Sequence, residues 1–168
     1  TPLPRPTKID VEDVRRIVTG YPQAAAQLAL LGDKSFLFNE SRTGFIMYGV
    51  NGRSWVSLGD PIAPPGEAAE LIGSFIRLAD RNGGWAVFYK VAPTLLYIYL
   101  DHGLSVVKLG EEARVRLAGF SLEGSSRRNL RRVWRRMVED GYTFEMIQPE
   151  GIPSILPQLR AVSDEWKN

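Results

Sequence analysis

The sequence predicts an α/β (α+β) domain, in which helices flank a mixed sheet, over residues 9–120. Three observations support this fold class: segments with helical periodicity, short aromatic or β-branched runs, and turn residues between the two kinds of segment. The helices are predicted at residues 11–19, 23–31, 67–80 and 93–102. The strands are predicted at residues 35–39, 44–50, 53–58, 85–91, 104–109 and 113–117.

Capping and turn residues define the first half of this domain. Asp10 is expected to be the N-cap of the first helix, with Asp13 at the third helical position. Gly32 ends the second helix. Asn51-Gly52 is the dipeptide of a two-residue type I′ turn, so the second and third strands are expected to form a hairpin. The first three strands therefore predict an antiparallel meander.

In the second half, helices and strands alternate. Residues 67–80 carry an apolar stripe at helical spacing, which is typical of a helix packed on a sheet. Residues 85–91 are almost continuously apolar, which predicts a strand buried on both faces. Pro93 in the first turn and Gly103 after the last turn define the next helix.

The chain beyond residue 120 has a different organisation. Residues 121–141 are predicted to be a basic connector, in which Ser125 or Ser126 opens an arginine-rich helix and Gly141 closes it. A strand at 142–147 and a helix at 153–166 follow, and these two elements cannot enclose a core. Residues 142–168 are therefore expected to be the truncated start of a second domain. The proline-rich residues 1–8 predict an extended linker, so we expect this chain to be part of a longer polypeptide.

Composition excludes several kinds of site. The 168 residues include no cysteine and one histidine, so disulfides and cysteine-ligated metals are excluded and histidine-rich metal sites are disfavoured. No group of carboxylates has the spacing of a known metal loop, so no metal is expected. No apolar run approaches the roughly 20 residues that a membrane-spanning helix needs.

The net charge of +2 hides a strong asymmetry. Six of the 21 basic residues lie between residues 127 and 136, with no acidic residue among them. Without those six, 15 basic residues face 19 acidic ones, a balance of −4. Such a local concentration of positive charge indicates an anionic partner.

The arginine-rich helix separates its charge from its apolar residues. At about 100° per residue, one half of the helix surface carries Arg127, Arg128, Arg131, Arg132, Arg135 and Arg136, and the other half is apolar. A solvated surface helix is the ordinary interpretation of such a charge run. Here four i,i+4 arginine pairs repel one another by roughly 0.2–0.5 kcal/mol each, which favours a surface that binds an anion. Arginine also suits bidentate phosphate contacts, and the pattern leaves both tRNA and anionic lipid open as the partner.

Four other residues are candidates for a ligand-binding cleft because they lie at or beside predicted strand ends: Lys34, Arg53, Asp60 and Tyr89. The competing interpretation is that these four residues form turns, lie at the rim of the domain or belong to its core. The run Gly32-Asp33-Lys34-Ser35 does not have the spacing of a phosphate-binding loop and precedes a strand.

Several motifs in order resemble one family. They are residues 30–38 (LLGDKSFLF), 47–50 (MYGV), 52–55 (GRSW), 58–61 (LGDP), 109–113 (LGEEA) and 120–124 (FSLEG), the last leading into the arginine helix. Together they resemble the C-terminal cytoplasmic synthase region of the phosphatidylglycerol lysyltransferases, the multiple peptide resistance factor family. The resemblance runs nearly end to end.

The resemblance implies a fold and an activity. It implies two GNAT-like (acetyltransferase-like) folds joined by a basic helix, and a preceding membrane region. It also implies an enzyme at the cytoplasmic face of the bacterial inner membrane, with aminoacyl-tRNA, phosphatidylglycerol, the membrane surface and the rest of its own polypeptide as partners. Transfer of lysine or alanine to the lipid would lower the attraction of the membrane for cationic antimicrobial peptides. Much of the chemistry in this family belongs to the second fold, so no catalytic residue is assigned and the fragment alone is expected to be inactive.

The resemblance leaves two alternatives open. One is a binding module for tRNA or anionic membrane without chemistry, and the other is an acetyl-CoA-dependent acetyltransferase. The connection Val91-Ala92-Pro93-Thr94 has no glycine, whereas GNAT enzymes that bind acetyl-CoA have a glycine-rich pyrophosphate turn there. This difference favours aminoacyl-tRNA as the donor and no cofactor.

Overall fold

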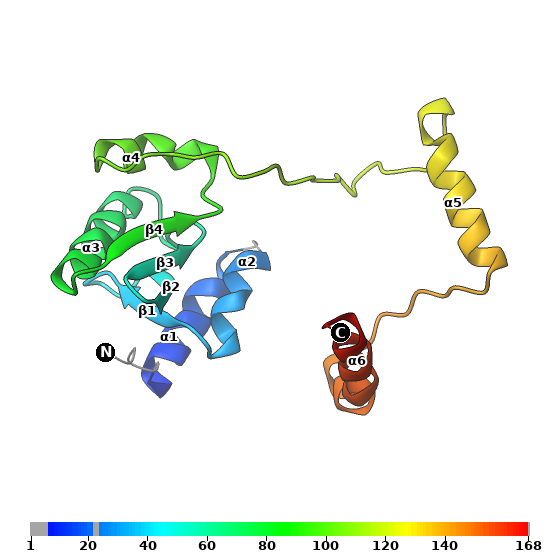
Figure 1. Ribbon diagram of the computed structural model, residues 1–168, viewed down its shortest axis with the longest axis horizontal. Coiled ribbons are helices and arrows are strands. Elements are labelled where there is room, and N and C mark those ends of the chain that lie inside the picture. The colour runs from blue at the N-terminus through cyan, green and yellow to red at the C-terminus, as the bar shows by residue number, and fades with distance from the viewer. Residues whose placement is uncertain (1–6, 22–23, 168) are drawn as a thin grey trace. The chain divides into compact units, whose positions relative to one another are not determined.

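The computed structural model describes residues 7–21 and 24–167 and divides the chain into two compact units, Thr1–Gly110 and Glu111–Asn168 (Figure 1). Most of the linker predicted at residues 1–8, and the start of the helix predicted at Gln23, lie outside the described residues. The first unit has the predicted mixed α/β architecture. Its elements, in chain order, are α1 (Lys8–Thr19), α2 (Ala24–Gln27), η1 (Leu28–Leu31), β1 (Ser35–Phe38), β2 (Phe45–Asn51), β3 (Ser54–Leu58), α3 (Ala68–Arg81), β4 (Trp85–Tyr89), η2 (Pro93–Leu95) and α4 (Leu96–Asp101).

The sheet of the first unit has the order β1-β2-β3-β4. β1, β2 and β3 form the predicted antiparallel meander, and β4 pairs in parallel with β3. The hairpin between β2 and β3 differs by one residue from the prediction, because its loop is Gly52-Arg53 and Asn51 pairs with Ser54. Only Gly52 of the two loop residues has a positive φ (59°), whereas a type I′ turn needs positive φ at both.

The alternation of side chains along β2 places helices on both faces of the sheet. Phe45 and Met47 pack in a buried cluster with residues of α1, α2 and η1. Ile46 and Tyr48 point to the opposite face and pack with α3. A third cluster joins α3 to α4 (Figure 1). The core is therefore helix, sheet and helix in three layers, as the fold class requires.

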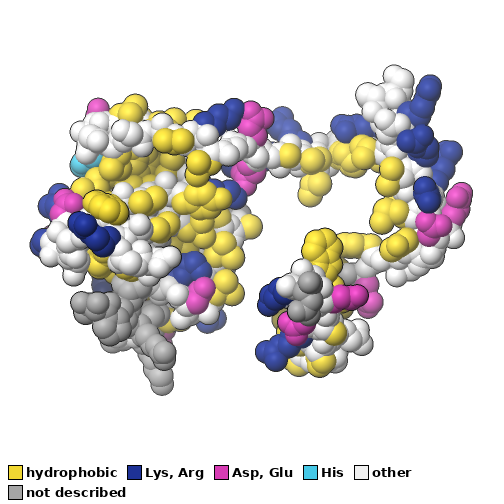
Figure 2. All heavy atoms as spheres, viewed as in Figure 1, with side chains coloured by type: hydrophobic (Ala, Val, Ile, Leu, Met, Phe, Trp, Pro, Cys, Tyr) yellow, Lys and Arg dark blue, Asp and Glu magenta, His cyan; other side chains and the backbone are white. Residues whose placement is uncertain are grey.

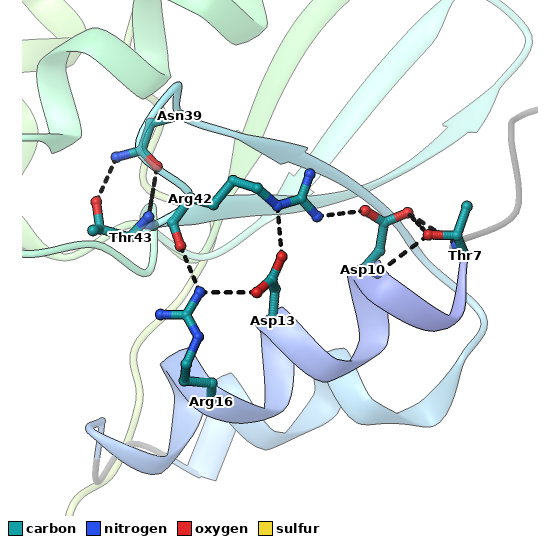
Figure 3. Close-up of polar contacts among 8 residues, drawn as sticks. Thr7, Asp10, Asp13, Arg16, Asn39, Arg42 and Thr43 are labelled. Carbon is teal, nitrogen blue, oxygen red and sulfur yellow. Dashed lines mark hydrogen bonds and ion pairs between the residues drawn. The ribbon is translucent and has the colours of Figure 1, made fainter.

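A polar network fixes α1 to the loop between β1 and β2 (Figure 3). The Arg42 guanidinium donates to Asp13 at 2.5 Å and to Asp10 at 2.7 Å. Arg16 donates to Asp13 at 2.9 Å and to the Arg42 carbonyl at 3.0 Å. The N-cap of α1 is Thr7, and Asp10, which was predicted to be the N-cap, completes the capping box from the third helical position. The prediction was wrong by one turn because Thr7 is itself a good N-cap residue and starts the helix earlier.

The network predicts a pH-dependent stability. A hydrogen bond from Arg42 lowers the pKa of Asp10, and hydrogen bonds from Arg16 and then Arg42 lower the pKa of Asp13. Lowered carboxyl pKa values stabilise the fold above the unfolded-state value of about 4, and this stabilisation is lost as the pH falls through the folded-state values. In urea unfolding, Arg42→Ala is therefore expected to be less stable than the parent near neutral pH, with the difference shrinking below about pH 4. A loss of stability in Arg42→Ala that is equally large near neutral pH and below about pH 4 would contradict this explanation.

Three predicted strands and one burial prediction are wrong. Residues 104–109, 113–117 and 142–147 form no strand in the structure. Their apolar side chains are largely exposed, because a β-branched run becomes a strand only where a neighbouring strand and a packed face are present. β4 was predicted to be buried on both faces. It is an edge strand whose Trp85, Val87 and Tyr89 are 59%, 41% and 47% exposed, while the alternate Ala86 and Phe88 are partly buried against the core under α3.

Candidate functional site

The basic segment of the second unit folds as the sequence predicts, into a helix. A turn of 3₁₀ helix, η3 (Ser125–Arg127), leads into α5 (Arg128–Glu139), and the second unit also contains η4 (Pro149–Gly151) and α6 (Ile152–Lys167). Gly124 and Gly141 flank the basic segment in left-handed conformations, with φ of 85° and 82°. Only glycine adopts such conformations without cost, so the two glycines set the limits of the helix.

The arginine side chains gather along α5 in Figure 2. Five of the six, with Glu139 and Asp140, line an open groove on this helix, and the sixth, Arg127, lies just before it. The opposite surface of α5 is apolar and is about half exposed in the described structure, at Leu130, Val133, Trp134 and Met137. The helix therefore has the two faces that the sequence predicts.

Three of the arginines contact neighbouring parts of the chain. Arg131 donates to the carbonyl oxygens of Leu122 and Gly124, the latter at 2.7 Å, and so holds the loop that precedes the helix. The Arg127 guanidinium lies 5.2 Å from the centre of the Phe120 ring, within the range of a cation–π contact.

The third of these arginines is at the other end of the helix. Arg136 lies 3.7 Å from Asp140 one turn further along, and both side chains are exposed. Such an exposed pair adds little stability.

The remaining three arginines, Arg128, Arg132 and Arg135, form no hydrogen bond or ion pair among the described residues, and all three are exposed. They are spaced at i, i+4 and i+7. This spacing places them in one line along the helix.

Asp60 and Tyr89, two of the four predicted cleft residues, lie at one end of the sheet. β3 and β4 are parallel, so their carboxyl ends meet, and the Gly59 amide donates to the Tyr89 carbonyl at 2.7 Å. Asp60 is held by two donors, the backbone amide of Ala92 at 2.8 Å and the hydroxyl of Tyr99 at 2.7 Å. Carboxyl ends of parallel strands are a common location for ligand sites, so this end of the sheet is a second candidate site.

The Asp60 carboxylate occupies a position that an anion would otherwise take. Ala92 is the N-cap of η2, which leads directly into α4, and free amides at such a helix start attract phosphates. Here the amide already donates to a built-in carboxylate. A pyrophosphate at this amide would have to displace the Asp60 carboxylate.

Tyr99 was not predicted from the sequence to be the partner of Asp60. The two residues are 39 positions apart, and an aromatic residue in an amphipathic helix is ordinarily a core residue. Tyr99 is indeed buried, and burial together with its hydrogen bond to the Asp60 carboxylate raises the pKa of its hydroxyl.

Tyr99→Phe is expected to destabilise the first unit by about 1–2 kcal/mol, because Asp60 loses a donor that water does not readily replace. Urea unfolding measures the loss. Tyr97→Phe is the matched control, since Tyr97 lies in the same helix with its side chain 62% exposed, and its effect is expected to be below about 0.5 kcal/mol. Equal losses of unfolding free energy in the two variants would show that the Asp60–Tyr99 hydrogen bond contributes nothing to stability.

Lys34 and Arg53 lie away from this end of the sheet. Lys34 precedes β1, at the other edge of the sheet, and its ammonium contacts the neighbouring Asp33 at 2.8 Å. Arg53 lies in the β2–β3 turn, where it donates to the Gly83 carbonyl at 2.9 Å and stacks over Trp85 at 4.5 Å. The structure therefore brings together two of the four predicted cleft residues, and a ligand role for any of them stays a prediction.

Two further kinds of feature are absent from the part of the chain that the structure describes. None of its helices is both long enough and apolar enough to cross a membrane. None of its His, Asp and Glu side chains form a group of three or more that could hold a metal ion.

Together, the fold and the site define a mixed α/β domain followed by a helix with one arginine-rich face. The chain belongs to the family described as phosphatidylglycerol lysyltransferase, C-terminal, which matches residues 15–168.

The similarity of the chain to curated relatives supports its assignment to this family. A phosphatidylglycerol lysyltransferase of Staphylococcus aureus (strain COL) is 34% identical over 157 residues, covering 93% of this chain and 19% of the relative. The protein of the same name from Staphylococcus xylosus is 32% identical over 141 residues, covering 84% of this chain and 17% of the relative. The chain thus spans less than a fifth of the length of these relatives.

Solved structures agree with the fold. The C-terminal domain of a putative lysylphosphatidylglycerol synthetase from Agrobacterium fabrum is 40% identical, with a TM-score of 0.84 over 94% of this chain and 50% of that one. L-PGS from Bacillus licheniformis is 33% identical, with a TM-score of 0.82 over 96% of this chain and 51% of that one. The fold class predicted from the sequence, a GNAT-like mixed sheet flanked by helices, is therefore confirmed.

Proposed function

We propose that this chain is part of an enzyme that transfers lysine or alanine from aminoacyl-tRNA to phosphatidylglycerol. The observation that carries the proposal is the joining of a fold shared with phosphatidylglycerol lysyltransferases to a helix with a continuous arginine face. The names of the relatives support the lipid acceptor and the transfer of lysine. The arginine face supports a phosphate-rich donor, because guanidinium groups bind phosphates in bidentate fashion.

The reaction is an ester exchange that needs no cofactor. The glycerol hydroxyl oxygen of the lipid bonds to the aminoacyl carbonyl carbon, and the bond from that carbon to the tRNA ribose oxygen breaks. The hydroxyl proton passes to the departing ribose oxygen. Because the tRNA ester is already activated, the enzyme has to align the two substrates and stabilise the tetrahedral oxyanion.

The Asp60 carboxylate at the start of η2 supports a donor other than acetyl-CoA. It occupies the helix-start amide at which a pyrophosphate would be expected. Acetyl-CoA is therefore expected to leave the thermal stability of the chain unchanged, whereas a ligand present at 100 times its Kd would add about 2.7 kcal/mol.

The proposed setting is the cytoplasmic face of the bacterial inner membrane, where charged tRNA and phosphatidylglycerol are both present. A lysyl group adds positive charge to an anionic lipid. The product would therefore weaken the attraction of the membrane for cationic antimicrobial peptides.

The test of the proposal is a lipid-product assay with the full-length protein, of which the relatives indicate that this chain is a part. Lysyl-tRNA or alanyl-tRNA and phosphatidylglycerol vesicles are expected to give aminoacyl-phosphatidylglycerol, and ribonuclease treatment of the tRNA is expected to abolish the product. The present chain alone is expected to give none. Absence of lipid product with both charged tRNAs would refute the proposal.

A further inference from the structure

One face of the sheet in the first unit is covered by helices over only part of its width. Met47 of β2 is buried there in the cluster formed with α1, α2 and η1, and Leu58 of β3 is partly buried against the same cluster. Tyr89 of β4 pairs with Leu58, so its side chain belongs to this face, and alternation along the strand places Trp85 and Val87 there too. In the described structure all three are about half exposed. We call Trp85, Val87 and Tyr89 the β4 strip.

The surface beside the β4 strip is open and carries no negative charge from its own segment. Val56 pairs with Val87 in the sheet and, on its other side, with Gly49, where a Cβ atom would meet no atom within 4 Å. Residues 82–100, which contain the strip, include no acidic residue. Figure 2 shows hydrophobic side chains exposed around β4. An apolar surface of this kind is typical of a contact with a partner or a membrane.

A basic residue lies at each end of the β4 strip. The Arg53 guanidinium stacks over Trp85, and its Nε donates to the Gly83 carbonyl, so its two terminal nitrogens form no hydrogen bond among the described residues. Lys90 directly follows the strip, roughly 16 Å from Trp85 at about 3.3 Å per residue. Its φ is 64°, a conformation that costs a lysine free energy. Among the described residues only Arg42 shares this feature without being glycine, and the Arg42 side chain binds two carboxylates.

The chemistry of this surface favours an anionic lipid membrane as the partner. Tryptophan and tyrosine are enriched at membrane–water interfaces, because their rings enter the apolar side while their polar groups stay hydrated. Basic residues beside such rings are attracted to anionic headgroups, and no acidic residue in 82–100 opposes that attraction. The relatives are named for phosphatidylglycerol, an anionic lipid. An enzyme that acts on this lipid has to reach the membrane surface.

We propose that the β4 strip, with Arg53 and Lys90 at its ends, is the surface through which the first unit enters the headgroup region of a phosphatidylglycerol membrane. The rings of Trp85 and Tyr89 lie among the lipid headgroups, and the two basic side chains contact lipid phosphates. This inference rests on the proposed function, because it names the surface at which the lipid acceptor is met.

Tryptophan fluorescence of this chain tests the inference at the strip itself. The chain has four tryptophans, and the variant Trp134→Phe, Trp166→Phe retains Trp55 and Trp85. Vesicles of phosphatidylglycerol with brominated acyl chains are expected to shift the emission to shorter wavelength and to quench it, since interfacial insertion reaches roughly 5–10 Å into the membrane. Adding Trp85→Phe leaves Trp55, which packs in the cluster under α3, and neither change is then expected. This readout is local, so vesicle binding through another basic segment does not produce it.

Kinetics of the full-length protein test whether the strip serves the reaction. The variant Trp85→Ser, Tyr89→Ser is expected to raise the KM for phosphatidylglycerol vesicles by about tenfold or more, because large apolar side chains no longer enter the membrane. The KM for charged tRNA is expected to stay unchanged. The matched control is Tyr97→Ser, Leu100→Ser, which removes two exposed apolar side chains from α4, the helix packed on α3 at the other face of the sheet. Its KM for vesicles is expected to change less than about twofold.

Four outcomes would overturn the inference: no binding of the vesicles by this chain, binding without quenching of Trp85, equal rises of the vesicle KM in the two double variants, or an unchanged vesicle KM with lowered thermal stability of the full-length strip variant. The last result would assign the strip to a contact with the rest of the polypeptide, since this chain covers about half of the solved relatives. The quenching measurement needs no charged tRNA. It therefore decides the inference even if the lipid-product assay refuted the proposed function.

Discussion

Phe75→Ala is expected to destabilise the first unit by about 3–5 kcal/mol, enough to unfold much of it under conditions where the parent is folded. Phe75 is fully buried on α3 and joins that helix to the sheet. Its ring lies 5.2 Å from that of Tyr48 and 5.3 Å from that of Phe88. Removal of the ring leaves a cavity between helix and sheet, because well-packed cores relax only partly around a deletion.

Urea unfolding at 25 °C measures this loss, and Tyr97→Ala is the control. Tyr97 is an aromatic residue of similar size in α4, but its side chain is 62% exposed, so its truncation is expected to cost below about 1 kcal/mol. Similar losses in the two variants would mean that α3 does not pack against the sheet as described.

Gly44→Ala is expected to cost about 2–4 kcal/mol, because the space for a side chain is already filled. A Cβ atom at residue 44 would lie 2.4 Å from the Ala63 Cβ, 2.8 Å from the Ala63 Cα and 3.0 Å from the Ile62 carbonyl. Relief of this overlap requires backbone movement. Such movement would break the two hydrogen bonds between Phe45 and Ile62, each 2.9 Å long.

Gly49→Ala is the matched control for this substitution. Gly49 lies in β2, the strand that Gly44 immediately precedes, and a Cβ atom there would meet no atom within 4 Å. Alanine also loses less backbone entropy than glycine on folding, so this variant is expected to be neutral or slightly stabilised. If Gly49→Ala proved as harmful as Gly44→Ala, the close approach of residues 44 and 63 could not be the cause.

Much of the fold could be predicted from local sequence signals, because these signals act within a few residues. Helical periodicity placed α1, α3 and α5, and alternating aromatic and β-branched runs placed the meander. The strands predicted at residues 104–109, 113–117 and 142–147 were wrong, because strand formation depends on a neighbouring strand that no local pattern specifies. Phe144 illustrates this point, since its side chain is typical of a strand yet is 91% exposed.

The candidate sites, like the fold, could be predicted only where the signal in the sequence is local. Helical geometry alone places all six arginines on one face of the basic segment formed by η3 and α5. It does not reveal that Arg131 turns back to the carbonyl groups of Leu122 and Gly124, because a non-helical loop has no periodicity from which its path can be predicted. Similarly, Asp60 was a candidate from its position after a strand, but its partner Tyr99 comes from a distant helix.

The central claim is that α5 holds the tRNA donor of an aminoacyl transfer to phosphatidylglycerol. Steady-state kinetics of the full-length protein with and without glutamine substitutions at Arg128, Arg132 and Arg135 (the arginine stripe) test it most directly, with charged tRNA and phosphatidylglycerol vesicles varied separately. If the stripe binds the donor, its replacement by glutamine raises the KM for charged tRNA by about tenfold or more and leaves the KM for vesicles and kcat nearly unchanged, since it removes binding and not chemistry. A rise in the KM for vesicles with an unchanged KM for charged tRNA would contradict the claim and assign the helix to the membrane.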